Sequence, residues 1–190
     1  MKTKYFLLVL VLSSYSFGLQ AQIQTINTAK SSVSWLGKKI TGQHEGGIKI
    51  KSGSLEIKNN KISSGNFVID MNTISCSDLE DEGYNQKLVG HLKSDDFFGV
   101  GKFPNAILKI NNSSAFLNNV ASVKGQITIK GKTEDISFDV TNEKNTYSAK
   151  IEIDRSKFNV RYGSTSFFDT LGDKAIDDIF TLNIKLLTNN

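Results

Sequence analysis

Apolar and polar residues alternate along most of the chain with a period of two. Phe67, Ile69 and Met71, for example, take every second position. This alternation predicts β-strands that have one buried face and one hydrated face. Nine runs follow it and are identified by their apolar positions: Val33/Trp35, Ile48/Ile50, Leu55/Ile57, Phe67/Ile69/Met71, Ala106/Leu108/Ile110, Ile127/Ile129, Ile136/Phe138/Val140, Tyr147/Ala149/Ile151/Ile153 and Leu182/Ile184/Leu186.

Short polar segments join most of these runs. Asn59-Asn60, Asn118-Asn119 and residues 143–145 predict hairpin turns. Consecutive hairpins predict an antiparallel sheet. Because a sheet with one apolar face must close on itself or pack against another sheet, the pattern predicts an all-β barrel or sandwich.

The alternation disappears between Ser75 and Phe103. Ser77 and Glu80 have the spacing of a capping box, which predicts a helix start. Three apolar residues then fall at helical spacing: Tyr84, Leu88 and Leu92. We expect one or two short helices here, which act as a lid or plug at an open barrel end. A further helical turn is expected within residues 173–179.

The N-terminal residues follow the order that is typical of a secretory signal peptide: charged residues, then an apolar run, then a small residue. Lys2 and Lys4 precede an apolar run over residues 5–12, and the small residue Ala21 suits a cleavage site. The run is too short for a stable membrane anchor. We expect a signal peptide over residues 1–21 and a single domain over residues 22–190; a buried N-terminal helix is the alternative.

Removal of this segment lowers the net charge. The chain has 23 Lys plus Arg against 19 Asp plus Glu, and without Lys2 and Lys4 the count is 21 against 19, a net of +2. No basic patch remains to predict nucleic-acid binding. No later stretch is long enough to cross a membrane. The sequence therefore predicts an exported protein, periplasmic or secreted.

Few residues suit catalysis or metal binding. The single cysteine excludes an internal disulfide framework and a cysteine-based zinc site. His44 beside Glu45, and His91 near Asp95 and Asp96, could bind a metal or act as acid and base. The alternative, which we favour at this stage, is that both histidines are hydrogen-bonded structural residues near loops.

Sequence motifs of common enzymes are missing too. Cys76 has no histidine or basic cluster near it in the sequence to activate it and is expected to be a buried or semi-buried free thiol. The glycine-rich residues 42–47 lack the lysine and the strand-to-helix context of a phosphate-binding loop. No G-x-S-x-G or H-E-x-x-H motif occurs. We therefore assign no catalytic residue, metal or resident cofactor, and predict that the protein is not an enzyme.

Aromatic and aliphatic residues are abundant instead, which raises the question of a ligand cavity. An eight-stranded barrel is wide enough either to be filled by side chains or to hold one slim ligand. Several candidates for inward positions are small and would leave space: Ala106, Ala149, Gly65 and Gly125.

A series of motifs, in this order, resembles the YceI-like family and covers nearly all of the chain after residue 21. The most specific are the segment from His91 to Phe98 and the segment from Thr128 to Thr133, which begins T-I-x-G. The others are Val33-Ser34-Trp35, His44-Glu45-Gly46, Gly65-x-Phe67-x-Ile69-Asp70-Met71, Phe103-Pro104-x-Ala106, Val123-x-Gly125-x-Ile127, Asp154-Arg155 and Tyr162-Gly163.

This resemblance implies a lipocalin-like antiparallel eight-stranded barrel, with the short helices inserted after about the fourth strand. It also implies an exported bacterial protein that holds a long isoprenoid chain, of quinone or polyprenyl type, for transport or storage. Transient membrane contact and homodimer formation are further expectations from the family.

The expected ligand-binding residues form two groups. The lumen and its closing segment would be lined by Trp35, Phe67, Ile69, Phe97, Phe98, Phe103, Leu108, Ile127, Ile129, Phe138 and Ile151. Polar contacts near a mouth would come from His44, Asp70, His91, Asp96, Arg155 and Tyr162. For Asp70 and Arg155 we favour a structural role, because a buried charge is expected to be paired.

Two other functions stay open at this stage. A barrel filled by its own side chains would be an interaction or stress protein without a ligand. A lipid- or quinone-modifying enzyme would need both histidines and a carboxylate to converge in one pocket.

Overall fold

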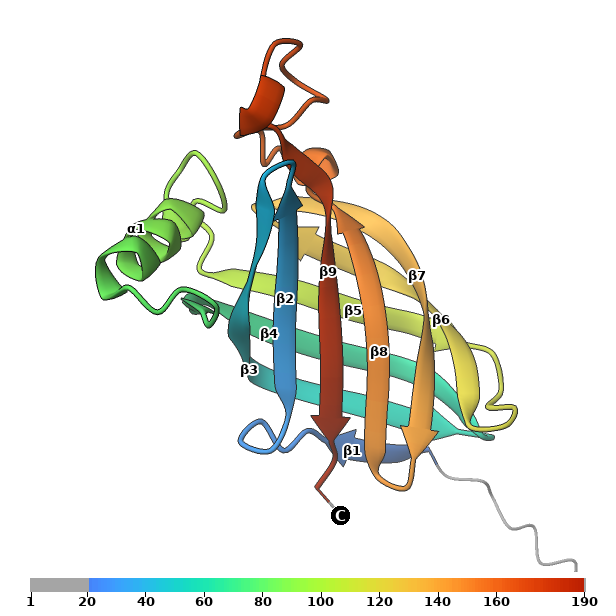
Figure 1. Cartoon of the computed structure of the whole chain (residues 1–190). Helices are drawn as coiled ribbons and strands as arrows, with labels where there is room; N and C mark the ends of the chain where they lie inside the picture. The colour runs from blue at the N-terminus through green and yellow to red at the C-terminus, as the bar shows by residue number, and fades with distance from the viewer. Residues whose placement is uncertain (1–20, 190) are drawn as a thin grey trace, which may run out of the picture.

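Eight antiparallel strands, β2 to β9, close on themselves into a barrel (Figure 1). The computed structural model describes residues 21–189. The predicted signal peptide therefore lies outside the described residues, apart from Ala21. The strands are β1 (Gln22–Thr25), β2 (Ser32–Lys39), β3 (Gly42–Lys58), β4 (Lys61–Cys76), β5 (Asn105–Ser113), β6 (Val120–Ile129), β7 (Lys132–Glu143), β8 (Thr146–Asp154) and β9 (Ile176–Leu187).

Each barrel strand pairs with its neighbours in the sequence, and β2 pairs with β9 to close the barrel. The strand β3 is long enough to pair with β2 over its first half and with β1 over its second half, along the same edge. The all-β barrel prediction is confirmed. Of the nine predicted runs, the second and third both lie on β3, and the short β1 was not predicted.

The hairpin turns follow the predicted asparagines. Asn59 and Asn60 have φ of 51° and 57°, and Asn118 and Asn119 have φ of 48° and 65°. Two consecutive residues with positive φ give the turn whose twist matches paired strands. The turn Lys130-Gly131, with φ of 49° and 75°, has the same form and joins β6 to β7.

One helix, α1 (Glu82–Lys93), follows β4 as expected. It begins at a different residue from the predicted capping box. Asp81 is the N-cap, and its carboxylate accepts a hydrogen bond from the backbone N–H of Tyr84 at 2.9 Å. The hydroxyl of Ser77 instead donates to the carbonyl oxygen of Glu45. The capping-box prediction is therefore wrong, because Ser77 is held on β3. With only 12 residues, α1 is too short to span a membrane, and no other described helix is longer.

The second helical prediction is also wrong for most of its length. Residues 173–179 were expected to form a turn of helix. Only the 3-10 turn η2 (Gly172–Lys174) forms, and β9 begins at Ile176. A second 3-10 turn, η1 (Arg155–Phe158), follows β8. Ile176 is drawn into the sheet because it pairs with Lys39 of β2.

The barrel interior contains two hydrophobic clusters. One lies at the end nearer to α1 and includes Leu92, Phe97, Ile129 and Phe158. The other lies at the opposite end and includes Leu55, Ile62 and Val123, which are at most 2% exposed.

Gly65 and Gly125 were expected to leave space in the barrel interior. Instead they allow neighbouring strands to pack closely. Gly65 and Gly125 pair with Ile110 from its two neighbouring strands. A Cβ atom at Gly125 would overlap the carbonyl oxygen of Lys109, and one at Gly65 would lie 3.0 Å from Leu55. These glycines therefore let β4, β5 and β6 approach one another closely beside the second cluster.

Gly46 and Gly47 give a matched test of close strand packing. A Cβ at Gly46 would overlap the carbonyl oxygen of Ser75 and the ring of Trp35, whereas one at Gly47 would have its nearest neighbour at an ordinary 3.5 Å. We expect Gly46→Ala to destabilise the fold by about 1–3 kcal/mol or more, because backbone must move.

Gly47→Ala is the control and should be near neutral, or stabilising by about 0.4–1 kcal/mol through the unfolded chain. Urea unfolding followed by circular dichroism measures both variants. Equal stability of the two proteins would contradict the packing argument.

Candidate functional site: an apolar barrel lumen

A cavity of about 180 Å³ lies inside the barrel. Along β9 its lining runs from Phe180 to Leu186, and a strand rises about 3.3 Å per residue, so this part of the wall spans about 20 Å. Ala106 and Ala149 lie on the wall, as expected of small inward residues. An engineered apolar cavity of about 150 Å³ accepts benzene in another protein. The interior is thus not completely filled.

Almost all of the predicted lumen residues line this cavity. They are Trp35, Phe67, Ile69, Phe97, Phe98, Leu108, Ile127, Ile129, Phe138 and Ile151. Their contact with a ligand stays a prediction. Phe103 lies apart from the lining and packs beside the turn at Gly131, where a Cβ would come within 2.8 Å of its ring.

The two ends of the cavity differ. At the β1 end its wall is formed by Leu55, Ile62 and Tyr147, which are all buried. The Tyr147 hydroxyl donates to Gln24 of β1 at 3.0 Å, so β1 helps to cover this end. At the other end the wall includes the charged residues Arg155 and Asp177.

The segment after α1 plugs this second end. Leu92 at the end of α1 and Phe97 beyond it are both buried, and both line the cavity together with Phe98. The prediction of an end-plug is consistent with this packing. The ring of His91 meets the ring of Tyr162 edge-on, with centroids 4.3 Å apart, and the ring of Phe97 with centroids 5.8 Å apart.

Arg155 is the central polar residue of this end and is only 2% exposed. Its guanidinium donates to four backbone carbonyl oxygens, those of Val160, Tyr162, Ile176 and Asp177, at 2.8–3.0 Å. It also lies 5.4 Å from the centre of the Phe97 ring. Arg155 therefore joins the loop after β8, the start of β9 and the plug.

The charge of Arg155 is balanced by an acid that the sequence did not single out. Its Nη2 lies 3.3 Å from Oδ1 of Asp178. Burial raises the pKa of Asp178, but hydrogen bonds from Ser164 and Ser166 and the charge of Arg155 outweigh this effect, so the pKa lies below its ordinary value. The expectation that a buried arginine is paired is met, with Asp178 as the partner.

A second, more polar cavity of about 490 Å³ lies outside the plug. Asp96 and Tyr162, two of the predicted mouth residues, line it together with Lys130 and Arg161. The Lys130 ammonium donates to the backbone carbonyls of Asp95 and Phe97 at 2.9 and 2.6 Å, which ties the plug to the end of β6. Burial lowers the pKa of Lys130 despite its acidic neighbours.

Asp70 and His44 belong to neither cavity. The carboxylate of Asp70 accepts hydrogen bonds from the backbone and side-chain N–H groups of Asn72, both at 3.0 Å, and these bonds lower its pKa. Asp70 thus fixes an irregular part of β4, in line with the structural role favoured from the sequence. His44 Nδ1 donates to Asp78 at 2.8 Å.

A sequence model of the YceI-like domain matches residues 24–187, which is most of the chain. The chain belongs to the YceI-like family. The resemblance of the sequence motifs is thereby confirmed.

Solved structures show the same fold. BcnA of Burkholderia cenocepacia is 26% identical, with a TM-score of 0.68 over 86% of this chain and 99% of that one. A polyisoprenoid binding domain of Saccharophagus degradans, implicated in plant cell wall breakdown, is 11% identical, with a TM-score of 0.58 over 87% and 97%. The YceI protein of Campylobacter jejuni is 23% identical, with a TM-score of 0.50 over 67% and 72%. No curated protein matches the chain.

In this YceI-like protein the sequence reasoning missed Lys130 and Asp178. Lys130 acts through backbone carbonyls, and Asp178 acts through the buried Arg155. Only folding brings these partners close. Lys130 does stand inside the family motif from Thr128 to Thr133, which is the one signal that could have singled it out. Asp178 lies in a stretch that was expected to be helical, so its neighbours could not be inferred.

Arg155 gives a prediction about stability. Arg155→Met leaves Asp178 without its cation and four carbonyls without their donor, so we expect a loss of about 3–5 kcal/mol in the free energy of unfolding. Arg161→Met is the control: this guanidinium stacks on Phe167 at the surface, 4.7 Å from the ring centre, and should cost about 0.5–1 kcal/mol. Denaturant unfolding measures both, and similar losses would contradict the role given to Arg155.

Proposed function

We propose that this chain binds the hydrocarbon chain of an isoprenoid lipid, of quinone or polyprenyl type, inside the barrel, and carries or stores it. The observation that carries the proposal is the elongated cavity, whose wall is apolar apart from Ser148 and the charged residues Arg155 and Asp177. A filled barrel, the alternative considered from the sequence, would lack this space. The polyisoprenoid binding domain of Saccharophagus degradans, which shares the fold, supports the same class of ligand.

The energetics suit a carrier. Burying a CH₂ group from water is worth about 0.8 kcal/mol. A tail of several isoprene units would exceed the practical limit of about 18–21 kcal/mol if water were its source. A bilayer is as apolar as the lumen, so transfer from membrane to barrel should be nearly neutral. Such a protein can both load and release its lipid, with selection by the shape of the cavity and by the head group.

A binding role also fits the polar residues better than an enzyme does. The enzyme alternative required His44, His91 and a carboxylate to converge in one pocket. His91 instead contacts Tyr162 and Phe97, whereas His44 contacts Asp78. The proposal includes export with cleavage near Ala21, because the N-terminal residues follow the order of a signal peptide. It also includes homodimer formation, which rests on the family resemblance.

A variant that fills the lumen tests ligand binding. Ala149 lies on the cavity wall, and Lys150 beside it is exposed. We expect Ala149→Phe to reduce uptake of a polyprenol or a long-tailed quinone at least tenfold, because the ring occupies the space of the lipid chain. Lys150→Phe adds the same ring outside the barrel and should bind like the parent protein.

Native mass spectrometry of detergent-free protein, with organic extraction of any adduct, is the measurement. Melting temperatures verify that both variants are folded. If Ala149→Phe does not fold, Leu182→Phe, at another position of the cavity lining, replaces it. Absence of an isoprenoid adduct, combined with no uptake of offered quinones or polyprenols by the parent protein, would refute the proposal.

The lipid would enter at the end that is closed by the plug. Here Ile40, at the tip of the β2–β3 hairpin, and Phe168 are 68% and 46% exposed. The backbone N–H of Ile40 donates to the carbonyl of Ala175, so the hairpin lies beside the start of β9 (Figure 1). Exposed apolar side chains at this end suit brief contact with the surface of a bilayer.

We therefore expect the double variant Ile40→Ser/Phe168→Ser to slow lipid extraction from phosphatidylcholine vesicles several-fold. The control is Ile23→Ser/Leu117→Ser at the β1 end, where the two residues are even more exposed, at 74% and 76%. Transfer of a fluorescent polyprenyl analogue from vesicle to protein measures the rate. Equal rates for the two double variants would contradict an opening at the plug end.

A further inference from the structure

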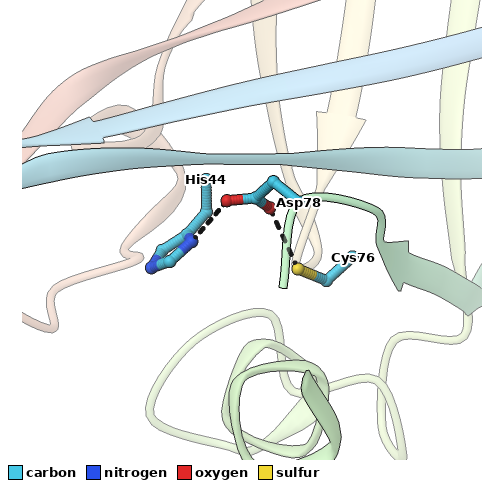
Figure 2. Close-up of side chains that lie close together, drawn as sticks. All are labelled: His44, Cys76 and Asp78. Carbon is cyan, nitrogen blue, oxygen red and sulfur yellow. Dashed lines mark hydrogen bonds and ion pairs between the residues drawn. The ribbon is translucent and has the colours of Figure 1, made fainter. Parts of the chain in front are cut away.

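Three side chains with metal-binding atoms converge at the rim of the barrel. They are His44 at the start of β3, Cys76 at the end of β4 and Asp78 just beyond it (Figure 2). Their nitrogen, sulfur and oxygen ligand atoms all lie within 4.8 Å of one another. Cys76 and Asp78 are more than thirty residues away from His44 in the sequence, so folding brings the three side chains together.

The backbone around these side chains is held in place. The Asp78 carboxylate accepts a hydrogen bond from the backbone N–H of Glu45 at 3.0 Å, and the N–H of Ser77 donates to the carbonyl of Glu45 at 2.9 Å. The side chain of Asn85, on α1, donates to the carbonyl of Cys76 at 3.1 Å. Both flanks of the set are thus fixed, as metal ligands generally are by surrounding hydrogen bonds.

The hydrogen bonds inside the set show where a cation would sit. The imidazole Nδ1–H of His44 points at one carboxylate oxygen of Asp78, at 2.8 Å, and the thiol of Cys76 points at the other, at 3.1 Å. Each bond places a proton between a ligand atom and the carboxylate. A metal ion in that space would replace both hydrogen bonds: the thiol proton leaves to solvent, and the neutral imidazole keeps its proton on Nε2 instead.

We propose that His44, Cys76 and Asp78 form a binding site for a divalent transition metal ion, Zn²⁺ in the first place. A thiolate, an imidazole and a carboxylate are all ligands that zinc accepts in tetrahedral geometry. Mg²⁺ and Ca²⁺ prefer sets made only of oxygen atoms. The His44 and Asp78 side chains are 29% and 27% exposed, so water can reach the fourth position.

This proposal revises two arguments from the sequence. A single cysteine argued against a cysteine-based zinc site, and Cys76 had no histidine near it along the chain. The first argument considered only sites built from several cysteines, and the second considered only neighbours in the sequence. Pairing of β3 with β4 places Gly46 opposite Cys76, which brings the start of β3, with His44, beside the thiol.

Direct binding tests the site. Reduced protein without an affinity tag is titrated with ZnCl₂ in a calorimeter, and with CoCl₂ in a spectrophotometer. We expect one equivalent of Zn²⁺ to bind with a dissociation constant in the micromolar range or below. Bound Co²⁺ should show the near-ultraviolet charge-transfer band of a cobalt–thiolate bond, which a site made of surface acids and histidines cannot give.

Matched variants identify the ligands. Cys76→Ser, His44→Gln and Asp78→Asn should each weaken Zn²⁺ binding at least tenfold, and Cys76→Ser should abolish the cobalt band. His91→Gln and Glu80→Gln make the same chemical changes outside the set and should leave the affinity unchanged. Melting temperatures without metal verify folding.

The parent protein alone can overturn the proposal. No binding at 100 µM free Zn²⁺, or binding without a cobalt–thiolate band, would rule out this site whatever the variants do. Equal affinity in all five variants would assign the metal to another place on the surface. Lipid uptake is measured separately, so failure of the metal site and failure of the lumen proposal can be told apart.

Discussion

Pairing of β2 with β9 is the interaction on which the rest of the structure depends. Without it the sheet would have two open edges, and its apolar face would need a second layer. With it, the inward positions of eight strands face one another across a single lumen. The small side chains at Ala106 and Ala149 then leave space, because no strand can move closer without breaking its hydrogen bonds to both neighbours.

Closure also creates two ends that must be covered, and the chain covers them in different ways. At the β1 end the cover is built from tight packing, helped by Gly65 and Gly125, which let neighbouring strands approach. At the other end the cover is a separate segment. Lys130 holds it through the backbone carbonyls of Asp95 and Phe97, and the guanidinium of Arg155 lies 5.4 Å from the centre of the Phe97 ring. A separate segment can move away from the barrel end without breaking the pairing of the barrel strands, whereas the cover at the β1 end consists of residues of the strands themselves. This asymmetry is why we place lipid exchange at the plug end.

The sequence predicted the barrel because alternation is a local signal that survives without knowledge of partners. The inward-facing residues of the strands could be predicted from the same alternation. Shifting a strand by one residue would exchange its two faces and expose its apolar side chains to water. The predicted helix start was wrong because several residue types can cap a helix. Tertiary contacts hold Ser77 on β3 and leave Asp81 as the N-cap. The pairing of Arg155 with Asp178, and that of Cys76 and Asp78 with His44, could not be predicted, because the partners lie on elements distant in the sequence.

The same alternation that lines the lumen accounts for two of the three proposed metal ligands, His44 and Cys76. On β3 the inward series Ile50 and Ile48 continues, two residues at a time, through Gly46 to His44, and on β4 Ile74 is followed by Cys76. The series changes from apolar to ligand-bearing side chains at the rim, where water becomes accessible. Gly46 marks the change, because the missing side chain leaves room for Trp35 to donate to the carbonyl of Ser75 at 3.0 Å. Trp35 thereby lies between the apolar lumen and the polar rim, so a metal ion at His44 and a lipid in the barrel would occupy adjacent but distinct sites.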